Sequence, residues 1–286
     1  MAVYEHSYKP YDGALTPAWS RFLVLPRYAY ETVFKSKFAI GFLVACMIAP
    51  LLYTILIYLN HNVSALEILG LPAGAAIPIT PEFFGILIGI QTGLGFLFTV
   101  VNGPVLLSRD LANNALPLYL CRPFNRWEYV AGKASVLLIV WSSITWIPGL
   151  LLFLFQSYLA GGGWFTNNFW VARAILISSL AWSLSWTLLA MAFSAWIKWR
   201  TAASAALFAI FVIPTPIAGA MAGLFHTQRG FLFNIAFLLG EMTARLFGNP
   251  PEFKFATWEI WIGLACFALV SLWMISRKLR AYEVVS

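Results

Sequence analysis

The sequence predicts an all-α polytopic membrane protein with six transmembrane helices, and three observations support this prediction. Only 10% of the residues are charged and 61% are hydrophobic, whereas a soluble domain has about 25% charged residues. Six apolar runs approach or exceed the roughly 20 residues that a helix needs to cross a bilayer. Basic residues gather at the ends of these runs. Most of the protein surface must therefore face lipid or another subunit.

Residues 1–37 precede the first apolar run and are more polar. Thr16-Pro17 predicts a helix start, because threonine caps helices and proline fits their first position. Arg27, Glu31 and Lys35 follow at four-residue spacing, which places three charges along one helical face. We expect a cytosolic tail followed by a helix that lies in the membrane interface. The alternative is a plain cytosolic start to the first span.

Residues 38–286 are predicted to form a single transmembrane domain. Pro50 is expected to kink the first span. The apolar stretch Phe231 to Gly240 is too short to cross a bilayer, so a re-entrant or surface-lying helical pair is expected before the last span. The predicted spans cover about 38–59, 83–107, 127–155, 171–197, 202–225 and 258–275.

Glycines recur every fourth residue in the second and fifth spans. Small residues at this spacing leave one helix face nearly bare and let another helix approach closely. We therefore expect tight helix or dimer packing at Gly85, Gly89, Gly93, Gly219 and Gly223.

The distribution of lysine and arginine predicts the orientation. Loops 60–82 and 156–170 contain neither residue, whereas the N-terminal segment, the 108–133 connector, the Lys198–Arg200 turn and the C-terminal tail are basic. Basic loops stay in the cytosol, so both termini are predicted to be cytosolic. The net charge of +7 is therefore accounted for by basic residues that anchor the spans on the cytosolic side. For this reason no nucleic acid is expected as a partner.

No enzyme, cofactor or metal site is visible in the sequence. The three cysteines and three histidines are scattered. Gly132-Lys133 lacks the glycine of a phosphate-binding loop five residues earlier, where Trp127 stands, and the following Ser or Thr, where Ala134 stands. The predicted span interiors contain almost no ionisable residue, which argues against a proton-coupled carrier.

The most polar segment between two spans is the connector from Ser108 to Lys133. Leu107 and Leu111 begin an apolar helical face, and Ser108 is positioned to cap that helix. Asn125 with Glu128 resembles a capping box, from which a helix would run into the third span. A short helix joined rigidly to a span acts as a lever, so the connector is predicted to dock a soluble partner. An ordinary basic loop is the alternative.

Along the connector the chain carries the series Arg109-Asp110, Ala115-Leu116, Arg122-Pro123, Arg126 and Gly132-Lys133. This series resembles the connector of the permease subunits of ABC-2 type transporters. The overall plan is also similar, with an interfacial first helix, six spans, a large last outer loop and a basic tail. Asp110 stands where glutamate is usual in that family, and Asn113-Asn114 where an acidic residue and glycine are more common.

The resemblance implies a non-enzymatic permease subunit in a prokaryotic cytoplasmic (inner) membrane, most consistent with an exporter. Separate nucleotide-binding ATPase subunits would dock on the connector, which acts as a coupling helix, and a second permease copy or a homologous permease would complete the pathway within the membrane lipid. The alternative is a non-transporting membrane anchor or scaffold subunit of a larger complex. The residues expected to meet the ATPase are Arg109, Asp110, Arg122, Pro123, Arg126, Trp127 and Glu128.

The substrate pathway is expected to be apolar and aromatic, with a few hydroxyl groups. Side chains on the fourth span could line such a pathway or could simply pack helices together. They are Trp182, Ser183, Ser185, Trp186 and Thr187.

Overall fold

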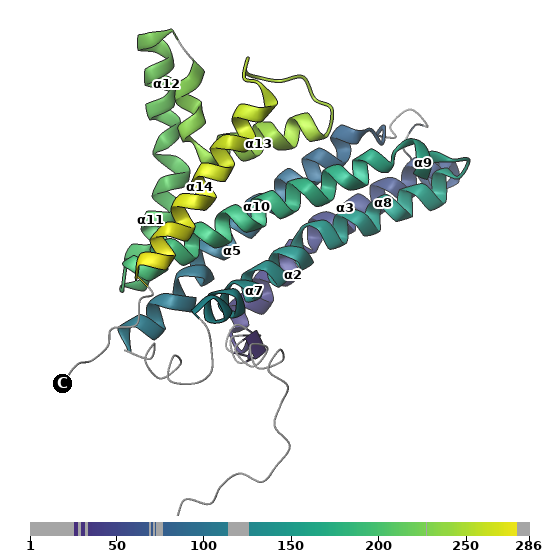
Figure 1. Cartoon of the computed structure of the whole chain (residues 1–286). Helices are drawn as coiled ribbons and strands as arrows, with labels where there is room; N and C mark the ends of the chain where they lie inside the picture. Colours follow the sequence, from purple (N-terminus) through teal and green to yellow (C-terminus); the bar gives the residue numbers. More distant parts are fainter. Residues whose placement is uncertain are drawn as a thin grey trace, which may run out of the picture.

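The structure is a computed structural model, and every regular element in its described part is a helix (Figure 1). Six helical stretches are long and apolar enough to cross a membrane, which confirms the predicted number of spans. They are Lys37–His61, Pro81–Ser108, Trp127–Ala160, Phe169–Trp196, Arg200–Phe225 and Thr257–Lys278. The described residues are 26–27, 30–31, 34–68, 70, 72, 77–113, 126–226 and 228–278.

The six spans alternate between broken and continuous helices. The second, fourth and sixth are single helices: α5 (Pro81–Ala112), α10 (Phe169–Trp196) and α14 (Thr257–Lys278). The first, third and fifth are each divided in two. Their halves are α2 (Lys37–Cys46) and α3 (Ile48–His61), α7 (Arg126–Ile144) and α8 (Trp146–Ala160), and α11 (Arg200–Val212) and α12 (Pro214–Phe225).

Proline explains each break. Pro50 and Pro148 each lie three residues after the break, at Met47 and Thr145, and Pro214 directly follows the break at Ile213. A proline has no N–H to donate, and its ring clashes with the carbonyl four residues earlier, so the preceding turn opens. The predicted kink in the first span is therefore present as a full interruption.

The break in the first span frees a carbonyl group, and a neighbouring helix satisfies it. Residue 50 would normally donate to the Cys46 carbonyl oxygen, but proline cannot. Gln91 Nε2, from α5, donates to this oxygen instead at 3.1 Å. Both Gln91 and Cys46 are fully buried. Because an unpaired buried carbonyl is costly, this bond ties α5 to the break between α2 and α3.

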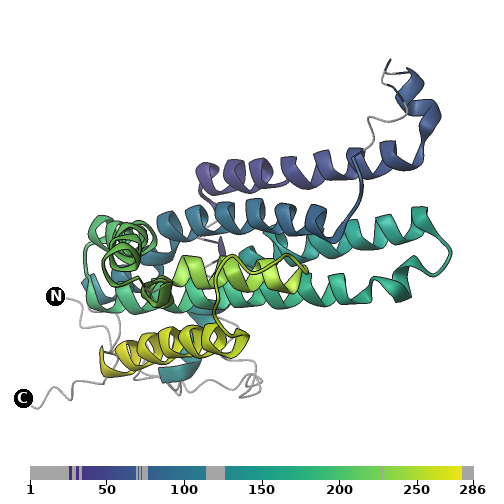
Figure 2. The same cartoon turned by 90° about the horizontal axis from the view of Figure 1, so that it is seen from above.

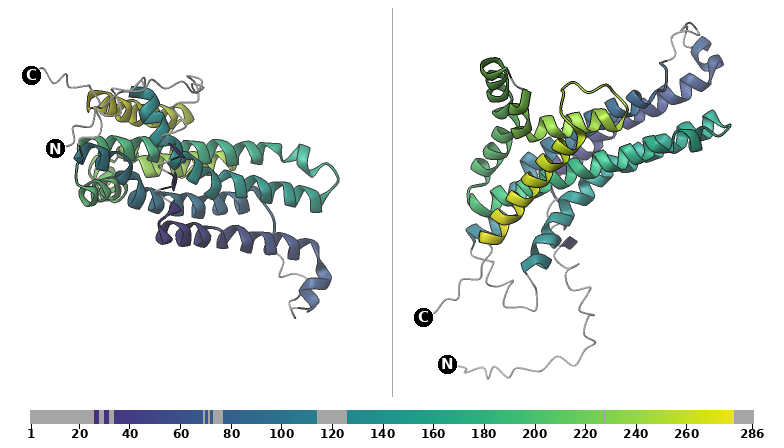
Figure 3. Two further views of the ribbon diagram at one scale, coloured as in Figure 1. Left: turned by 90° about the horizontal axis from the view of Figure 1, so that it is seen from below. Right: turned by 45° about the horizontal axis from the view of Figure 1, so that its top comes forward.

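Helices α5 and α10 form the centre of the bundle. Small residues let the helices approach: a Cβ atom on Gly103 would lie 2.9 Å from the Ala190 Cβ, and one on Gly95 would lie 2.8 Å from the Trp141 ring. The Trp141 indole donates to Thr99 Oγ1 at 2.8 Å. Helices α2–α3 and α14 lie on opposite sides of this centre (Figures 2 and 3).

The fifth span is divided in its packing: α11 lies against α5 and α10, whereas α12 extends away from the bundle as an arm (Figure 1). Only 11% of the apolar window of the whole span is buried, against 56% for the fourth span. Phe96 of α5 stacks on Phe211 near the base of the arm, with ring centroids 4.4 Å apart. The arm is therefore held along one side and open on the others.

Shorter helices lie at and near the end opposite the basic segments. They are α4 (Val63–Ile68), α9 (Trp164–Asn167), the 3-10 helix η3 (Gln228–Phe233) and α13 (Ile235–Leu246). The last two lie between the fifth and sixth spans, where a re-entrant or surface-lying helical pair was predicted, and they are two short helices in sequence. Asn234, between them, donates through Nδ2 to Thr215 of α12 at 2.9 Å, and Trp182 of α10 donates to Thr243 of α13 at 3.0 Å. The pair therefore bridges the arm and the bundle.

The described part of the N-terminal segment is short. Lys35 Nζ lies 2.7 Å from Glu31 Oε1, as their spacing predicted. The hydrogen bond from Lys35 and its positive charge hold the pKa of Glu31 below its usual range. The rest of the predicted interfacial helix, including Thr16-Pro17, lies outside the described residues.

Candidate functional site

The structure describes the two ends of the predicted docking site. They are the last turn of α5 and the first turn of α7, which we call the roots of the connector. Arg109 and Asp110 lie in the last turn of α5. Arg126, Trp127 and Glu128 form the start of α7. The remaining two predicted docking residues, Arg122 and Pro123, lie outside the described residues, as do the other residues of the connector from 114 to 125.

A polar cluster joins these two roots. Lys133 Nζ of α7 lies 2.9 Å from Asp110 Oδ2 of α5. The Tyr129 hydroxyl donates to the same Asp110 oxygen at 2.7 Å, and Lys133 Nζ lies 5.9 Å from the centroid of the Tyr129 ring. We call Asp110, Tyr129 and Lys133 the latch. It brings together residues 19 and 23 positions apart in the sequence.

The latch is shielded from solvent. The side chains of Lys133 and Asp110 are 12% and 16% exposed, and Tyr129 is 1% exposed. Charge-assisted hydrogen bonds are stronger than neutral ones and strengthen further where water is scarce. The two charges compensate each other, so the latch can be buried at the edge of the bundle.

The latch rests on an apolar cluster to which four helices contribute. Leu107 comes from α5, Tyr129 and Val130 from α7, and Ile275 from α14, and all are buried. The α10 members are Met191, Ala192 and Ala195. The two roots of the connector therefore share one apolar cluster with α10 and α14.

The predicted docking residues divide into an inward and an outward part. Asp110 is paired within the latch, whereas Trp127 is 56% exposed. Glu128 is half-buried beside it. Trp127 is thus open to a partner, and Asp110 instead positions α5 against α7.

The predicted cap at Ser108 is wrong. Ser108 lies inside α5, is buried, and its hydroxyl donates to the Pro104 carbonyl oxygen at 2.5 Å. The second span therefore continues for a full turn past the expected end. This back-bond to the residue four positions earlier is a common alternative for serine within a helix.

The five predicted packing glycines fall into two groups. A Cβ atom on Gly85 would lie 3.3 Å from the Phe247 ring, so this glycine serves a contact within the chain. The other four have no atom of another residue within 4 Å of that position, and they lie on exposed faces. They are Gly89, Gly93, Gly219 and Gly223.

The side chains suggested for a substrate pathway are largely packed inside the bundle. Trp186 is fully buried between Phe96 and Phe211, with ring centroids 4.5 and 5.9 Å away. Ser183 and Thr187 are also buried. In the single chain these residues therefore pack helices together and do not line an open pathway.

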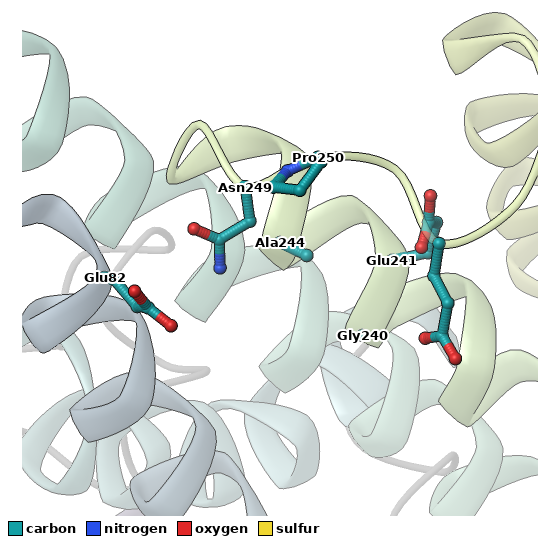
Figure 4. A pocket seen from close by; sticks show the side chains of 7 residues that line it. Glu82, Gly240, Glu241, Ala244, Asn249 and Pro250 are labelled. Atoms are coloured by element: carbon teal, nitrogen blue, oxygen red, sulfur yellow. The ribbon is translucent and has the colours of Figure 1, made fainter.

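A pocket of about 340 Å³ lies at the end opposite the connector (Figure 4). Its lining includes three carboxylates, of which Glu241 is buried and paired with Arg245 at 2.8 Å. Arg245 also donates to the Phe253 carbonyl at 3.1 Å. Only the four-residue spacing of Glu241 and Arg245 signalled this site in the sequence. The lining residues are Glu82, Gly240, Glu241, Ala244, Asn249, Pro250 and Glu252.

The described residues hold no group of three His, Cys, Asp or Glu side chains that could bind a metal ion. Comparison with protein-family models and with curated proteins finds no match for this chain. The geometry therefore defines a helical membrane protein with a buried polar latch at the base of one connector.

Proposed function

We propose that the chain is the transmembrane permease subunit of an ATP-driven ABC transporter of the ABC-2 type, acting as an exporter. The observation that carries the proposal is the latch, because it fixes both roots of the connector to each other at 2.9 Å. A soluble partner that pushes the connector would move α5 and α7 as one unit. The resemblance of the connector to those of ABC-2 permeases supplies the kind of partner, a nucleotide-binding ATPase subunit.

In this proposal the residues at the connector have two roles. Arg109, Arg122, Pro123, Arg126, Trp127 and Glu128 meet the ATPase subunit. Asp110 does not contact the ATPase subunit and instead positions the roots of the connector, since its carboxylate is bound by Lys133 and Tyr129. Closure of two ATPase subunits around ATP would displace the connector, and the apolar cluster beneath the latch would pass that movement to α10 and α14.

The open glycines suit a second permease subunit. Gly89 and Gly93 on α5, with Gly219 and Gly223 on α12, have free space where a Cβ atom would stand. Bare helix faces of this kind let a helix from another subunit approach closely. In the same proposal η3 and α13 form a re-entrant pair on the outer side of a prokaryotic cytoplasmic membrane, and the connector and both termini are cytosolic.

Purification from the native membrane in a mild detergent tests the proposal. We expect a stoichiometric soluble partner with a phosphate-binding loop, and ATP hydrolysis by the complex. Recovery of the chain alone, or with a partner that has no nucleotide site, would favour the non-transporting scaffold instead.

Charge reversal tests the docking surface. Arg122→Glu with Arg126→Glu should weaken binding of the ATPase subunit by at least about tenfold, because close charges of the wrong sign oppose association. Membrane insertion should be unchanged. The matched control is Arg173→Glu with Lys254→Glu, which makes the same charge change at exposed positions away from the connector. Equal binding by the two double variants would contradict the docking assignment.

A charge swap tests the latch. Lys133→Met leaves the Asp110 carboxylate without its cation in a shielded place, and we expect it to lower the unfolding free energy by about 1–3 kcal/mol. Nucleotide-driven activity should fall more than partner binding, because the latch transmits movement rather than makes contact. Asp110→Lys combined with Lys133→Asp should recover part of both losses. If activity and binding fall in parallel and the swap restores neither, the latch has no coupling role.

A further inference from the structure

A second cluster of charges lies where the fourth and sixth spans end, at the same end of the bundle as the connector roots (Figure 1). It combines exposed indole rings with cationic side chains from α10, α14 and the turn after α10. We call it the basic–aromatic corner. Its members are Trp196, Lys198, Trp199, Trp273, Arg277 and Lys278.

Direct contacts join the α10 and α14 members of the corner. The Trp196 indole of α10 donates to the Met274 carbonyl of α14 at 3.0 Å. Lys278 Nζ lies 5.5 Å from the centroid of the Trp196 ring, which is a second contact between the two helices at this tryptophan. On the neighbouring face Arg277 Cζ lies 4.9 Å from the Trp273 ring. These distances are those of cation–π contacts, which place the cations beside the rings.

The positive charge of the corner is not compensated within the described part of the chain. Lys198, Arg277 and Lys278 make no ion pair with any described carboxylate. Segments 169–200 and 260–278 contain no Asp or Glu at all. By contrast, Lys35, Lys133 and Arg245 are each paired with a carboxylate. The corner is therefore a place where an external anion can bind.

Exposed aromatic rings indicate which kind of molecule the anionic group belongs to. Trp199 is 78% exposed, and Trp196 and Trp273 are also exposed. Indole rings favour the headgroup region of a bilayer, where one side is apolar and the other is wet. Both helices that form the corner are long and apolar enough to cross a membrane, so the corner ends up at the headgroup level. A soluble anion would not need exposed indoles around it.

We propose that the basic–aromatic corner binds the phosphate of an anionic phospholipid, with Lys198, Arg277 and Lys278 facing the headgroup and the three indoles packing beside its glycerol and upper acyl chains. Binding there would join α10 and α14 from outside the bundle, next to the Trp196–Met274 contact. This lipid site does not depend on the proposed transport function.

Lipid affinity can be measured on the intact chain. The protein would be placed in nanodiscs of phosphatidylcholine, alone or mixed equally with phosphatidylglycerol, and retained lipid would be counted by native mass spectrometry. We expect preferential retention of phosphatidylglycerol. Lys198→Gln with Arg277→Gln and Lys278→Gln should lower that preference by about tenfold or more, since each cation near an anionic surface adds to the attraction.

Controls separate a specific site from general attraction. Arg173→Gln with Lys254→Gln removes charge away from the corner and should leave the preference unchanged. Inorganic phosphate should not displace the lipid. Equal retention of the two lipids by the unmodified chain, or an undiminished preference in the triple variant, would overturn the proposal. Displacement by inorganic phosphate would show a site for free anions instead.

A second measurement does not rely on folding of the triple variant. Phosphatidylglycerol brominated near the headgroup should quench part of the tryptophan fluorescence of the unmodified chain. Trp199→Phe, at an exposed position, should remove a share of that quenching. Brominated phosphatidylcholine should quench less. Equal quenching by the two lipids, or no change in Trp199→Phe, would place the anionic lipid elsewhere.

Discussion

The closest approach between helices depends on a few single residues. Gly95 allows the Trp141 ring to lie against the α5 backbone, and Thr99, one turn further on, accepts the Trp141 indole N–H. Trp141 is fully buried and belongs to the largest apolar cluster. One aromatic side chain thus both fills space between α5 and α7 and joins them by a hydrogen bond.

Gly95→Ala is expected to destabilise the protein. Its new Cβ atom would lie 2.8–2.9 Å from three ring atoms of Trp141, which is fully buried. We expect a loss of about 1–3 kcal/mol in unfolding free energy, typical of an overpacked core. Gly240→Ala is the control, because nothing lies within 4 Å of that position and alanine favours a helix by about 0.5–1 kcal/mol. Thermal unfolding in detergent should separate the two, and a Gly95→Ala protein as stable as the control would contradict this account.

Pairing between distant residues was the part of the site that the sequence could not predict. Asp110 and Lys133 are 23 positions apart, and their meeting depends on how α5 and α7 dock in register. The sequence marked Asp110 as charged and near the membrane, which fits docking as well as it fits a latch. Ser108 failed as a cap for a related reason, since its hydroxyl has a competing acceptor within its own helix.

At the scale of whole elements, apolar length was a reliable guide, because each span must satisfy its own backbone in lipid and so must be helical. All six predicted spans are present as helices of sufficient length and hydropathy. Pro50 predicted the bend in the first span, but not which neighbour would bind the freed carbonyl group. That partner, Gln91 for Cys46, comes from another helix 45 positions away.

A double-mutant cycle tests the Gln91 bond. Gln91→Leu should lower the unfolding free energy by about 1 kcal/mol, because it leaves the Cys46 carbonyl unpaired. In a Pro50→Ala background residue 50 regains an N–H that can bind this carbonyl, so the same substitution should cost little. Chemical or thermal unfolding of the four proteins measures the coupling. Equal losses in both backgrounds would show that Gln91 does not replace the missing backbone bond.

At the scale of the molecule, the spans form a bundle around α5 and α10, from which α12 of the fifth span extends as an arm (Figure 1). The basic turn after α10 and the last residues of α14 lie at the same end as the connector roots. The glycine-rich turn at 161–163 lies at the other end, beside α9. The positive-inside rule predicts this grouping for a chain with both termini in the cytosol. The exception is the segment between α12 and α14, which carries Arg229, Arg245 and Lys254.

Cysteine labelling tests that orientation in intact cells. In a chain whose native cysteines are replaced by alanine, Gly162→Cys should react with a membrane-impermeant maleimide from outside. Lys35→Cys should react only after the membrane is permeabilised, since the two positions lie at opposite ends of the spans. Both residues are exposed, so access to reagent is limited by the membrane alone. The reverse pattern would invert the proposed topology and remove the connector from the cytosol.

Helix lengths add a consequence for the surrounding bilayer. At 1.5 Å per residue the 28 residues of α10 extend about 42 Å and the 22 residues of α14 about 33 Å. A hydrocarbon core is about 30 Å thick, so α14 can stand nearly upright, whereas α10 must tilt or project from it. Thicker membranes would draw the long helices upright and change their angle to the arm. Membrane thickness is therefore a physical variable that can change the tilt of α10 within the bundle.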